Sequence, residues 1–293
     1  MAAQKIRKAV FPAAGMGTRF LPATKATPKE MLALVDKPLI QYGVEEAVAA
    51  GVTEILLVTG RGKSTMEDHF DKSVELEAAL EARGRLTLLD EVRRVTKLAR
   101  ITYTRQAEAL GLGHAVLQAR EWVGDEPFAV ILPDDIVDAP GKGCIAQLIE
   151  AYEKTGASVL GSEVVEGAAI SAYGCLDCEK HQEDSRLLVV RDLVEKPEAS
   201  KAPSQNAIIG RYVLTPRIFE MLETIPPGLG GELQLTDAIK ALLAHEKVFG
   251  YLFEGKRHDA GDKVGFLKAT VEFALKRDDL GPSFREWLRQ QRF

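Results

Sequence analysis

The first half of the chain alternates short apolar runs with longer segments in which apolar residues recur at helical spacing. The runs at 8–12, 54–59, 101–104 and 128–132 are apolar almost throughout, as expected of strands that are covered on both faces. Strands that alternate with helices are the signature of an α/β fold. We therefore predict a parallel sheet flanked by helices.

The pattern changes after about residue 155. Four strand-like runs then follow one another without regular helices between them, at 157–165, 174–176, 187–194 and 207–214. Such runs are expected to extend the sheet with antiparallel or mixed strands. Helical patterns return from Pro216 onward, and the last, at 282–293, predicts a terminal helix that docks on the body or on a second subunit.

Composition excludes several classes of protein. The chain has 293 residues and a formal net charge of −5, without a block of Lys and Arg, which argues against general nucleic-acid binding. No apolar run approaches the roughly 20 residues that span a bilayer, and the start leads into a strand-like run rather than a signal-peptide core. Three cysteines are too few for a disulfide framework. We expect a cytoplasmic protein with neither nucleic-acid nor membrane partners.

The strongest local signal is the glycine-rich segment 13–19, directly after the first predicted strand. Glycine lets backbone N–H groups approach phosphate oxygens closely, so this strand-to-helix turn is a candidate phosphate loop. It is not a Rossmann fingerprint, because Phe20 stands where a small residue is needed, nor a Walker motif, because Arg19 stands in place of the lysine. A glycine turn that binds no ligand remains the alternative.

Three cations follow within a short loop that two prolines shape. Arg19, Lys25 and Lys29 could together neutralise a polyphosphate, with the guanidinium forming paired contacts and the lysines acting as point charges. A solvated basic loop is the alternative.

A second segment, 60–64, ends in Gly-Lys-Ser and imitates an ATPase P-loop. The first glycine of a P-loop would have to stand at Leu57, inside a predicted strand, so no loop is long enough to wrap a phosphate. Ser64 and Glu67 have the spacing of a capping box and predict the start of a helix.

Two adjacent carboxylates, Asp134 and Asp135, end the fourth predicted strand. Ligands of open α/β sheets bind at the carboxyl ends of strands, and Mg²⁺ prefers one or two carboxylates together with phosphate oxygens. The alternative is that the aspartates only cap a turn. Asp259 and Asp262 form a second acidic turn, in which Asp262 could cap the next helix.

Taken in order, the motifs resemble one family. Its members are the bacterial UTP-glucose-1-phosphate uridylyltransferases, or UDP-glucose pyrophosphorylases. The motifs are Gly-Met-Gly-Thr-Arg at 15–19, Pro-Lys-Glu-Met at 28–31, Gln106 with 111–115, Leu-Pro-Asp-Asp at 132–135 and Val-Glu-Lys-Pro at 194–197. The resemblance runs from about residue 6 to 276. The chain departs from it at Ala33, where the family usually has proline.

The resemblance implies a Rossmann-like nucleotidyltransferase fold, with a mixed central sheet flanked by helices and an inserted sugar-binding β region. It implies a single domain, with a nucleotide-binding half at 5–155, a sugar-phosphate-binding half at 156–260 and C-terminal helices at 261–293 that offer an oligomer contact. The implied reaction converts UTP and α-D-glucose 1-phosphate into UDP-glucose and pyrophosphate, with Mg²⁺ as cofactor. A homodimer or homotetramer is expected.

The resemblance also implies roles for residues, here given by position in this sequence. The catalytic residues are Arg19, Lys29 and Asp134. The nucleotide-binding residues are Ala13, Ala14, Gly15, Gly17, Thr18, Gln106, Gly111 and Asp135. The sugar-phosphate-binding residues are Gly174, Glu195 and Lys196, and the metal ligands are Asp134 and Asp259.

Two alternatives remain open on sequence grounds. One is a thymidylyltransferase or another sugar nucleotidyltransferase of the same fold. The other is a non-catalytic regulatory subunit that binds sugar nucleotides, although such a protein need not retain Arg19, Lys29 and Asp134 together.

Overall fold

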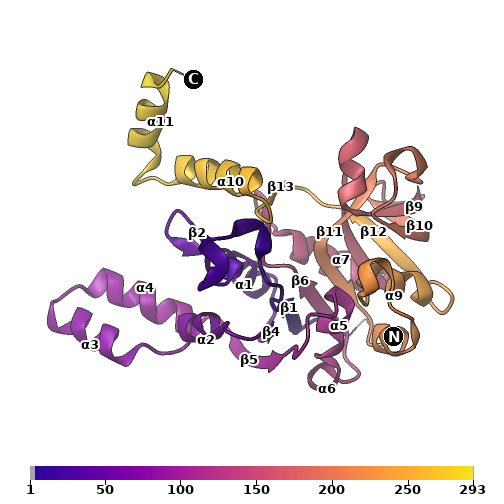
Figure 1. Ribbon diagram of the computed structural model, residues 1–293, viewed down its shortest axis with the longest axis horizontal. Helices are drawn as coiled ribbons and strands as arrows, with labels where there is room; N and C mark the ends of the chain where they lie inside the picture. The colour runs from indigo at the N-terminus through magenta and orange to yellow at the C-terminus, as the bar shows by residue number, and fades with distance from the viewer. Residues whose placement is uncertain (1–3, 293) are drawn as a thin grey trace.

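A nine-stranded mixed sheet runs through the described residues, 4–292, of the computed structural model (Figure 1). Its first four strands are β5 (Arg100–Arg105), β4 (Glu54–Thr59), β1 (Lys8–Pro12) and β6 (Phe128–Ile131). Neighbours among these four are parallel. The prediction of a parallel sheet in the first half is confirmed.

The second half of the chain extends the same sheet with mixed strands, as predicted. Next to β6 lies the antiparallel β11 (Asn206–Leu214), followed by β8 (Ser158–Val164), β12 (Val248–Leu252), β10 (Leu187–Glu195) and β9 (Gly174–Lys180). Only β8 and β12 pair in parallel here. Because β9 also pairs with β11, this end of the sheet curls back on itself.

Helices cover both faces of the sheet. One face packs against α1 (Leu39–Ala49) and α7 (Cys144–Thr155). The other packs against α5 (Leu112–Leu117), α8 (Ile218–Thr224) and α9 (Leu235–Leu242).

The alternation of side chains along β1 shows why its sequence is apolar throughout. Ala9 and Phe11 join the core under α1 and α7, whereas Val10 joins the core under α5, α8 and α9. All three are fully buried, because successive residues of a strand point to opposite faces.

Helix α2 (Ser64–Phe70) packs on the core through Met66 and Phe70, whereas α3 (Val74–Ala82) and α4 (Leu86–Thr96) extend from the body at the left of Figure 1. A short helix, α6 (Arg120–Val123), follows α5. Helix α2 begins at Ser64 as predicted, but the capping box was wrong, since no side chain caps this N-terminus.

Two small two-stranded sheets were not predicted. One is a hairpin of β2 (Ala33–Leu34) and β3 (Lys37–Pro38), and the other pairs β7 (Asp135–Asp138) with the distant β13 (Lys256–Asp259). The second sheet brings the two acidic turns of the sequence together, because Asp135 and Asp259 lie opposite each other in its register.

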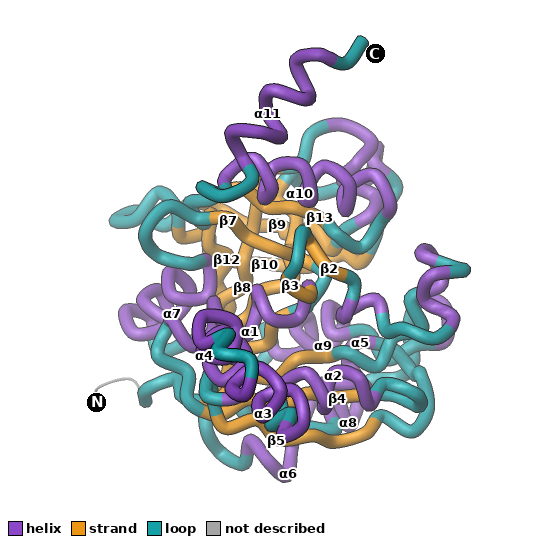
Figure 2. Tube along the Cα trace, turned by 90° about the vertical axis from the view of Figure 1, so that its left-hand side faces the viewer, coloured by secondary structure: helices purple, strands orange, loops and turns teal. Residues whose placement is uncertain are grey.

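The C-terminal region consists of α10 (Lys263–Lys276) and α11 (Gly281–Gln290). Asp262 caps α10 as predicted, with its carboxylate accepting the backbone N–H groups of Val264 and Gly265. Helix α11 contacts α10 and extends away from the body (Figures 1 and 2), so it does not dock on the body. Docking on a second subunit stays a prediction.

Among residues 4–292, none of the helices combines the length and the apolar character that crossing a bilayer requires.

Candidate active site

Two pockets open at the carboxyl ends of β1 and β6 and meet at Asp134. The first pocket is lined by the glycine turn after β1 and by the loop before α5. The second pocket is lined by β9, β10 and β11, by the start of α9 and by β13. Three residues line both pockets: Leu112, Leu132 and Asp134. Asp134 is therefore the only ionisable side chain common to the two linings.

The first pocket collects four of the predicted nucleotide-binding residues, Ala14, Gly15, Gln106 and Gly111, together with two of the predicted catalytic residues, Lys29 and Asp134. Gly15 is exposed and a Cβ on it would touch nothing, so its backbone is open to a ligand. Gly111 has φ +103°, and a Cβ there would lie 2.8 Å from the Leu233 carbonyl oxygen. Gln106 donates to the Gly111 carbonyl at 3.1 Å, which fixes its amide beside that glycine.

Four predicted nucleotide-binding residues do not line this pocket: Asp135, described below, and Ala13, Gly17 and Thr18. Ala13 is fully buried below the turn, and its backbone N–H donates to the carbonyl of Val58. Gly17 has φ +63°, a conformation suited to glycine, and its carbonyl accepts the Thr24 hydroxyl at 2.7 Å. Thr18 is exposed at the start of a 3₁₀ turn. In this structure Ala13 and Gly17 shape the turn rather than line the pocket.

A buried ion pair that sequence reasoning missed supports the turn from below. Lys63, from the Gly-Lys-Ser segment, donates to the Ala13 carbonyl and lies 2.9 Å from a carboxylate oxygen of Glu30. Glu30 is fully buried, and its other oxygen, Oε1, has no hydrogen-bond partner. Burial raises the pKa of Glu30 and lowers that of Lys63. Lys63, the lysine of the P-loop-like segment, thus connects the glycine turn to the loop that carries Lys29.

We expect Lys63→Met to lower the free energy of unfolding by about 3–5 kcal/mol, because it leaves the Glu30 carboxylate buried without its cation. Urea denaturation measures the loss. The double variant Lys63→Met/Glu30→Leu should recover much of it, since both charges are then removed. A single-variant loss no larger than that of an exposed ion pair would contradict the role assigned to this pair.

Asp134 is paired with Lys29 across the junction of the pockets. The Lys29 ammonium lies 2.5 Å from Asp134 Oδ2. Burial by itself would raise the pKa of the Asp134 carboxyl, but the charge and hydrogen bond of Lys29 outweigh it and leave the pKa below its usual value. Asp134 is therefore an anion held at the point where the two pockets meet.

Asp259 and Arg19 converge on the same point although they are far from Asp134 in sequence. A Cβ on Gly261 would lie 3.0 Å from Asp134 Oδ2, 3.0 Å from Asp259 Oδ1 and 3.7 Å from Arg19 Nη1. Both carboxylate oxygens therefore border the space beside Gly261, and they lie at most about 6 Å apart. Arg19 Nη1 also donates to the Gly261 carbonyl at 3.4 Å.

The donor set at Asp134 and Asp259 suits Mg²⁺ rather than a metal caged by protein alone. Over the described part of the chain, no group of three or more His, Cys, Asp or Glu side chains could hold a metal ion. A cation between these two carboxylates would need further ligands, and Mg²⁺ typically takes them from substrate phosphates and water.

Asp135 differs from the other predicted nucleotide-binding residues, because both of its carboxylate oxygens are bound by the protein. Oδ2 accepts the Gly210 N–H at 2.7 Å, and Oδ1 lies 2.5 Å from Arg257 Nε. The residue is buried and lines the second pocket, not the first. The structure therefore gives no support to Asp135 as a nucleotide contact.

The second pocket contains Gly174 and Glu195 as predicted, together with Tyr173 and Thr236, which were missed. Thr236 donates its hydroxyl to Glu195 Oε2 at 2.7 Å, which aims that carboxylate. A Cβ on Gly174 would lie 3.2 Å from Thr236 Oγ1 and 3.3 Å from Glu195 Oε2. Glycine at 174 thus keeps the pocket floor open beside the carboxylate.

Lys196 is not among the residues that line the second pocket. It has an unusual φ of +44°, its N–H donates to the Tyr173 carbonyl at 3.1 Å, and its side chain is about half exposed. The ammonium lies 3.5 Å from Glu195 Oε1. The backbone is therefore fixed at the pocket edge while the cation faces solvent.

A mixed α/β sheet with a glycine-rich turn after its first strand, nearby cations and two pockets joined at one carboxylate is the arrangement expected of a nucleotidyltransferase. In agreement, the sequence model of the nucleotidyl transferase family matches residues 8–275.

Close relatives narrow the class. The chain is 52% identical over 287 residues to UTP–glucose-1-phosphate uridylyltransferase 2 of Staphylococcus saprophyticus, covering 98% of each chain. A solved UTP-bound UGPase from Acinetobacter baumannii is 39% identical with a TM-score of 0.92, covering 98% of this chain and all of that one. A UDP-glucose pyrophosphorylase complexed with UDP-glucose is 42% identical with a TM-score of 0.84, covering 93% of this chain and all of that one.

The chain therefore belongs to the UTP–glucose-1-phosphate uridylyltransferase family. The resemblance seen in the sequence motifs is confirmed.

Proposed function

We propose that the protein transfers the uridylyl group of UTP to α-D-glucose 1-phosphate, giving UDP-glucose and pyrophosphate. The observation that carries the proposal is the meeting of two pockets at Asp134, with Lys29 and Arg19 beside it. Two substrates bound in adjoining pockets can react where the pockets meet, as a group transfer requires.

The first pocket suits UTP. Gln106 and Gly111 line the first pocket and not the second, and we assign them to the uracil. Lys29 and the open backbone at Gly15 line this pocket and are assigned to the triphosphate. Arg19 lines the second pocket beside the junction, and we assign it to the same phosphates because a second cation there can neutralise their oxygens.

The second pocket suits glucose 1-phosphate. The Glu195 carboxylate, oriented by Thr236, can accept hydrogen bonds from sugar hydroxyls. Glycine at 174 leaves room for a sugar ring beside it, so we assign both residues to the glucose. We assign the phosphate group to Lys196 at the pocket edge.

In the reaction, an oxygen of the sugar phosphate attacks the α-phosphorus of UTP and forms a new P–O bond. The bond from the α-phosphorus to the oxygen bridging the β-phosphate breaks, and its electron pair leaves with pyrophosphate. The attacking phosphate is already ionised near pH 7, given a second pKa of about 6, so no general base is required. Lys29 and Arg19 align the phosphates and neutralise charge, which provides most of the catalysis in phosphoryl-type transfer.

Asp134 and Asp259 would hold Mg²⁺, which fits their facing oxygens. When bound, the ion neutralises phosphate charge and orients the oxygens of the nucleotide.

We also propose that the protein is a homodimer or homotetramer that uses the C-terminal helices. The support is the way α11 stands off the body with Phe284 and Trp287 stacked at 5.8 Å and Trp287 about half exposed. Light scattering of the full chain measures the mass of the assembly.

A pyrophosphate-release assay tests the function. Glucose 1-phosphate and Mg²⁺ are supplied with UTP, dTTP, ATP or GTP at limiting concentrations. We expect UTP to give the highest kcat/KM. A preference for dTTP would instead support a thymidylyltransferase, and no turnover with any nucleotide would support a regulatory sugar-nucleotide-binding subunit.

Lys196→Ala should chiefly weaken binding of glucose 1-phosphate. The expected loss is on the order of 1.5–3 kcal/mol, the contribution of a hydrogen bond to a charged group. Calorimetry with each substrate separately measures the effect, and UTP affinity should hardly change. Lys201→Ala is a matched control, because that lysine is exposed and paired only with Glu198 nearby. A large loss of UTP binding would place Lys196 on the wrong substrate.

A further inference from the structure

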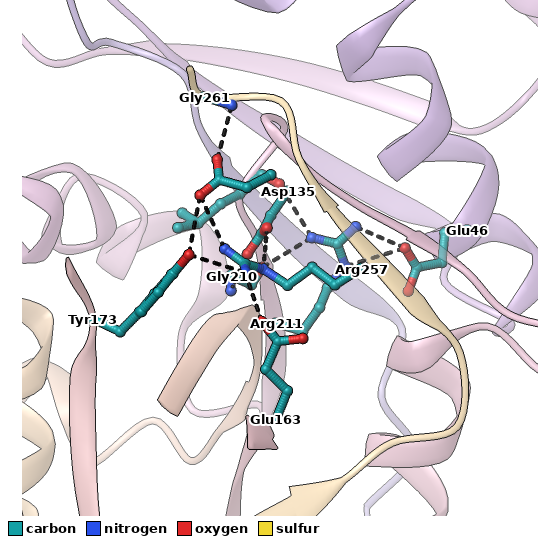
Figure 3. Close-up of polar contacts among 10 residues, drawn as sticks. Glu46, Asp135, Glu163, Tyr173, Gly210, Arg211, Arg257 and Gly261 are labelled. Atoms are coloured by element: carbon teal, nitrogen blue, oxygen red, sulfur yellow. Dashed lines mark hydrogen bonds and ion pairs between the residues drawn. The ribbon is translucent and has the colours of Figure 1, made fainter. Parts of the chain in front are cut away.

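Two carboxylates face each other where β7 and β13 pair, an arrangement that normally destabilises an antiparallel strand pair. Asp135 and Asp259 occupy opposite positions in the register, and like charges directly across a strand pair repel. Arg257 lies two residues before Asp259 on β13, so both side chains point to the same face of the strand. Its guanidinium contacts both acids, and Figure 3 shows it beside Asp135.

Each nitrogen of the Arg257 guanidinium contacts a different acid. Nε lies 2.5 Å from Asp135 Oδ1, Nη1 lies 2.6 Å from Glu163 Oε1, and Nη2 lies 3.3 Å from Asp259 Oδ2. The side chain is only 8% exposed, and its guanidinium carbon lies 4.8 Å from the centre of the Tyr173 ring. A lysine has one nitrogen and cannot span three carboxylates in this way.

The two carboxylate oxygens of Asp259 have different hydrogen-bond partners. Oδ2 is held by Arg257 and by the Tyr173 hydroxyl, each at 3.3 Å. Oδ1 accepts the Gly261 N–H at 2.9 Å and is the oxygen that faces Asp134. With Oδ2 held by Arg257 and Tyr173, Asp259 presents its Oδ1 edge to the junction of the pockets.

Arg257 acts on the other acidic turn through Asp135. That carboxylate also accepts the Gly210 N–H, and the Asp135 N–H donates to the Leu132 carbonyl at 3.3 Å, closing the turn that carries Asp134. The Ala260 N–H donates to the Asp134 carbonyl at 2.9 Å, which ties the two turns together directly. One guanidinium is thus anchored to both turns.

We propose that Arg257 is a positioning residue that fixes the two acidic turns so that Asp134 and Asp259 present their oxygens to one divalent cation. This inference rests on the proposed function, in which that cation is Mg²⁺. Arg257 acts through Asp135 and Asp259, and Glu163 and Tyr173 hold it in place.

The test measures cation affinity rather than turnover. Mn²⁺ is titrated into the full-length protein with saturating UTP and no glucose 1-phosphate, free Mn²⁺ is followed by electron paramagnetic resonance, and UTP alone gives the background. Arg257→Lys keeps a positive charge among the acids but loses the three separate guanidinium nitrogens that contact them. We expect it to raise the Kd for Mn²⁺ by roughly tenfold or more, as is typical when a group that orients metal ligands is lost. UTP affinity measured without divalent cation should be unchanged.

Lys256→Met is the matched control, since it removes a cation from the same strand where the side chain is exposed and pairs with Glu272. It should bind Mn²⁺ like the wild type. Arg257→Lys with wild-type Mn²⁺ affinity would overturn the inference while leaving the proposed function intact. If the wild-type protein with UTP binds no more Mn²⁺ than UTP alone does, the proposed metal role is overturned and the inference with it.

Glu163→Gln covers the case in which Arg257→Lys does not fold. Among the side-chain contacts described, Glu163 reaches the acidic turns only through Arg257, so any change in Mn²⁺ affinity must pass through the guanidinium. We expect a smaller rise in Kd in the same direction. Wild-type Mn²⁺ affinity in a folded Glu163→Gln protein would overturn the inference.

Discussion

Asp134→Asn is expected to lower kcat by roughly 10³-fold or more, at the upper end of losses seen when one preorganised electrostatic group is removed. The amide keeps the shape of the side chain but loses the charge that faces Asp259 and Lys29. The Lys29–Asp134 pair is partly open to solvent, so the ammonium can be hydrated in the variant and the fold should survive.

Steady-state kinetics over a range of Mg²⁺ concentrations, together with circular dichroism, measure both parts of this expectation. Asp138→Asn is the matched control: it makes the same change three residues beyond Asp135, on β7, at a carboxylate that pairs with Lys276 outside both pockets. The control should retain activity. Near wild-type turnover of Asp134→Asn at saturating Mg²⁺ would remove Asp134 from the catalytic residues.

Arg19→Lys is expected to lower kcat by roughly 10²-fold, in line with the loss of one transition-state donor. The guanidinium lies beside the point where Asp134 and Asp259 converge and also donates to the Gly261 carbonyl. A forked cation can hold that carbonyl and a phosphate oxygen at the same time, whereas an ammonium offers no fixed second donor. Binding of UTP in the ground state should change less than the rate.

Kinetics in both directions sharpen this test. Synthesis of UDP-glucose and its pyrophosphorolysis share one transition state, so an unchanged equilibrium requires both directions to lose activity together. Arg61→Lys is the matched control, since Arg61 is exposed and lines neither pocket. If Arg19→Lys works at nearly the wild-type rate, Arg19 supplies positive charge but no paired contact.

The sheet was predictable because its strands are buried on both faces. Val10 and its neighbours on β1 enter two different cores, so the whole run must be apolar, and such a run is visible in the sequence without knowledge of its partners. The pairing of β7 with β13 could not be predicted from such an apolar pattern. Its strands carry Asp135, Arg257 and Asp259, and polar residues in that pattern are as typical of turns as of strands.

The sequence by itself determined the local parts of the site, namely the glycine turn, the prolines that shape the loop of Lys29, and the strand-end carboxylate at Asp134. Each depends on backbone conformation or chemistry within a few residues. Only the tertiary structure decided that Asp259 faces Asp134, that Asp135 is occupied by Arg257, and that Lys63 supports the turn from below. These contacts join residues that are 50 to more than 120 positions apart in the chain. Which charged groups are buried together depends on how the whole chain packs, and the residues near each group do not indicate its partner.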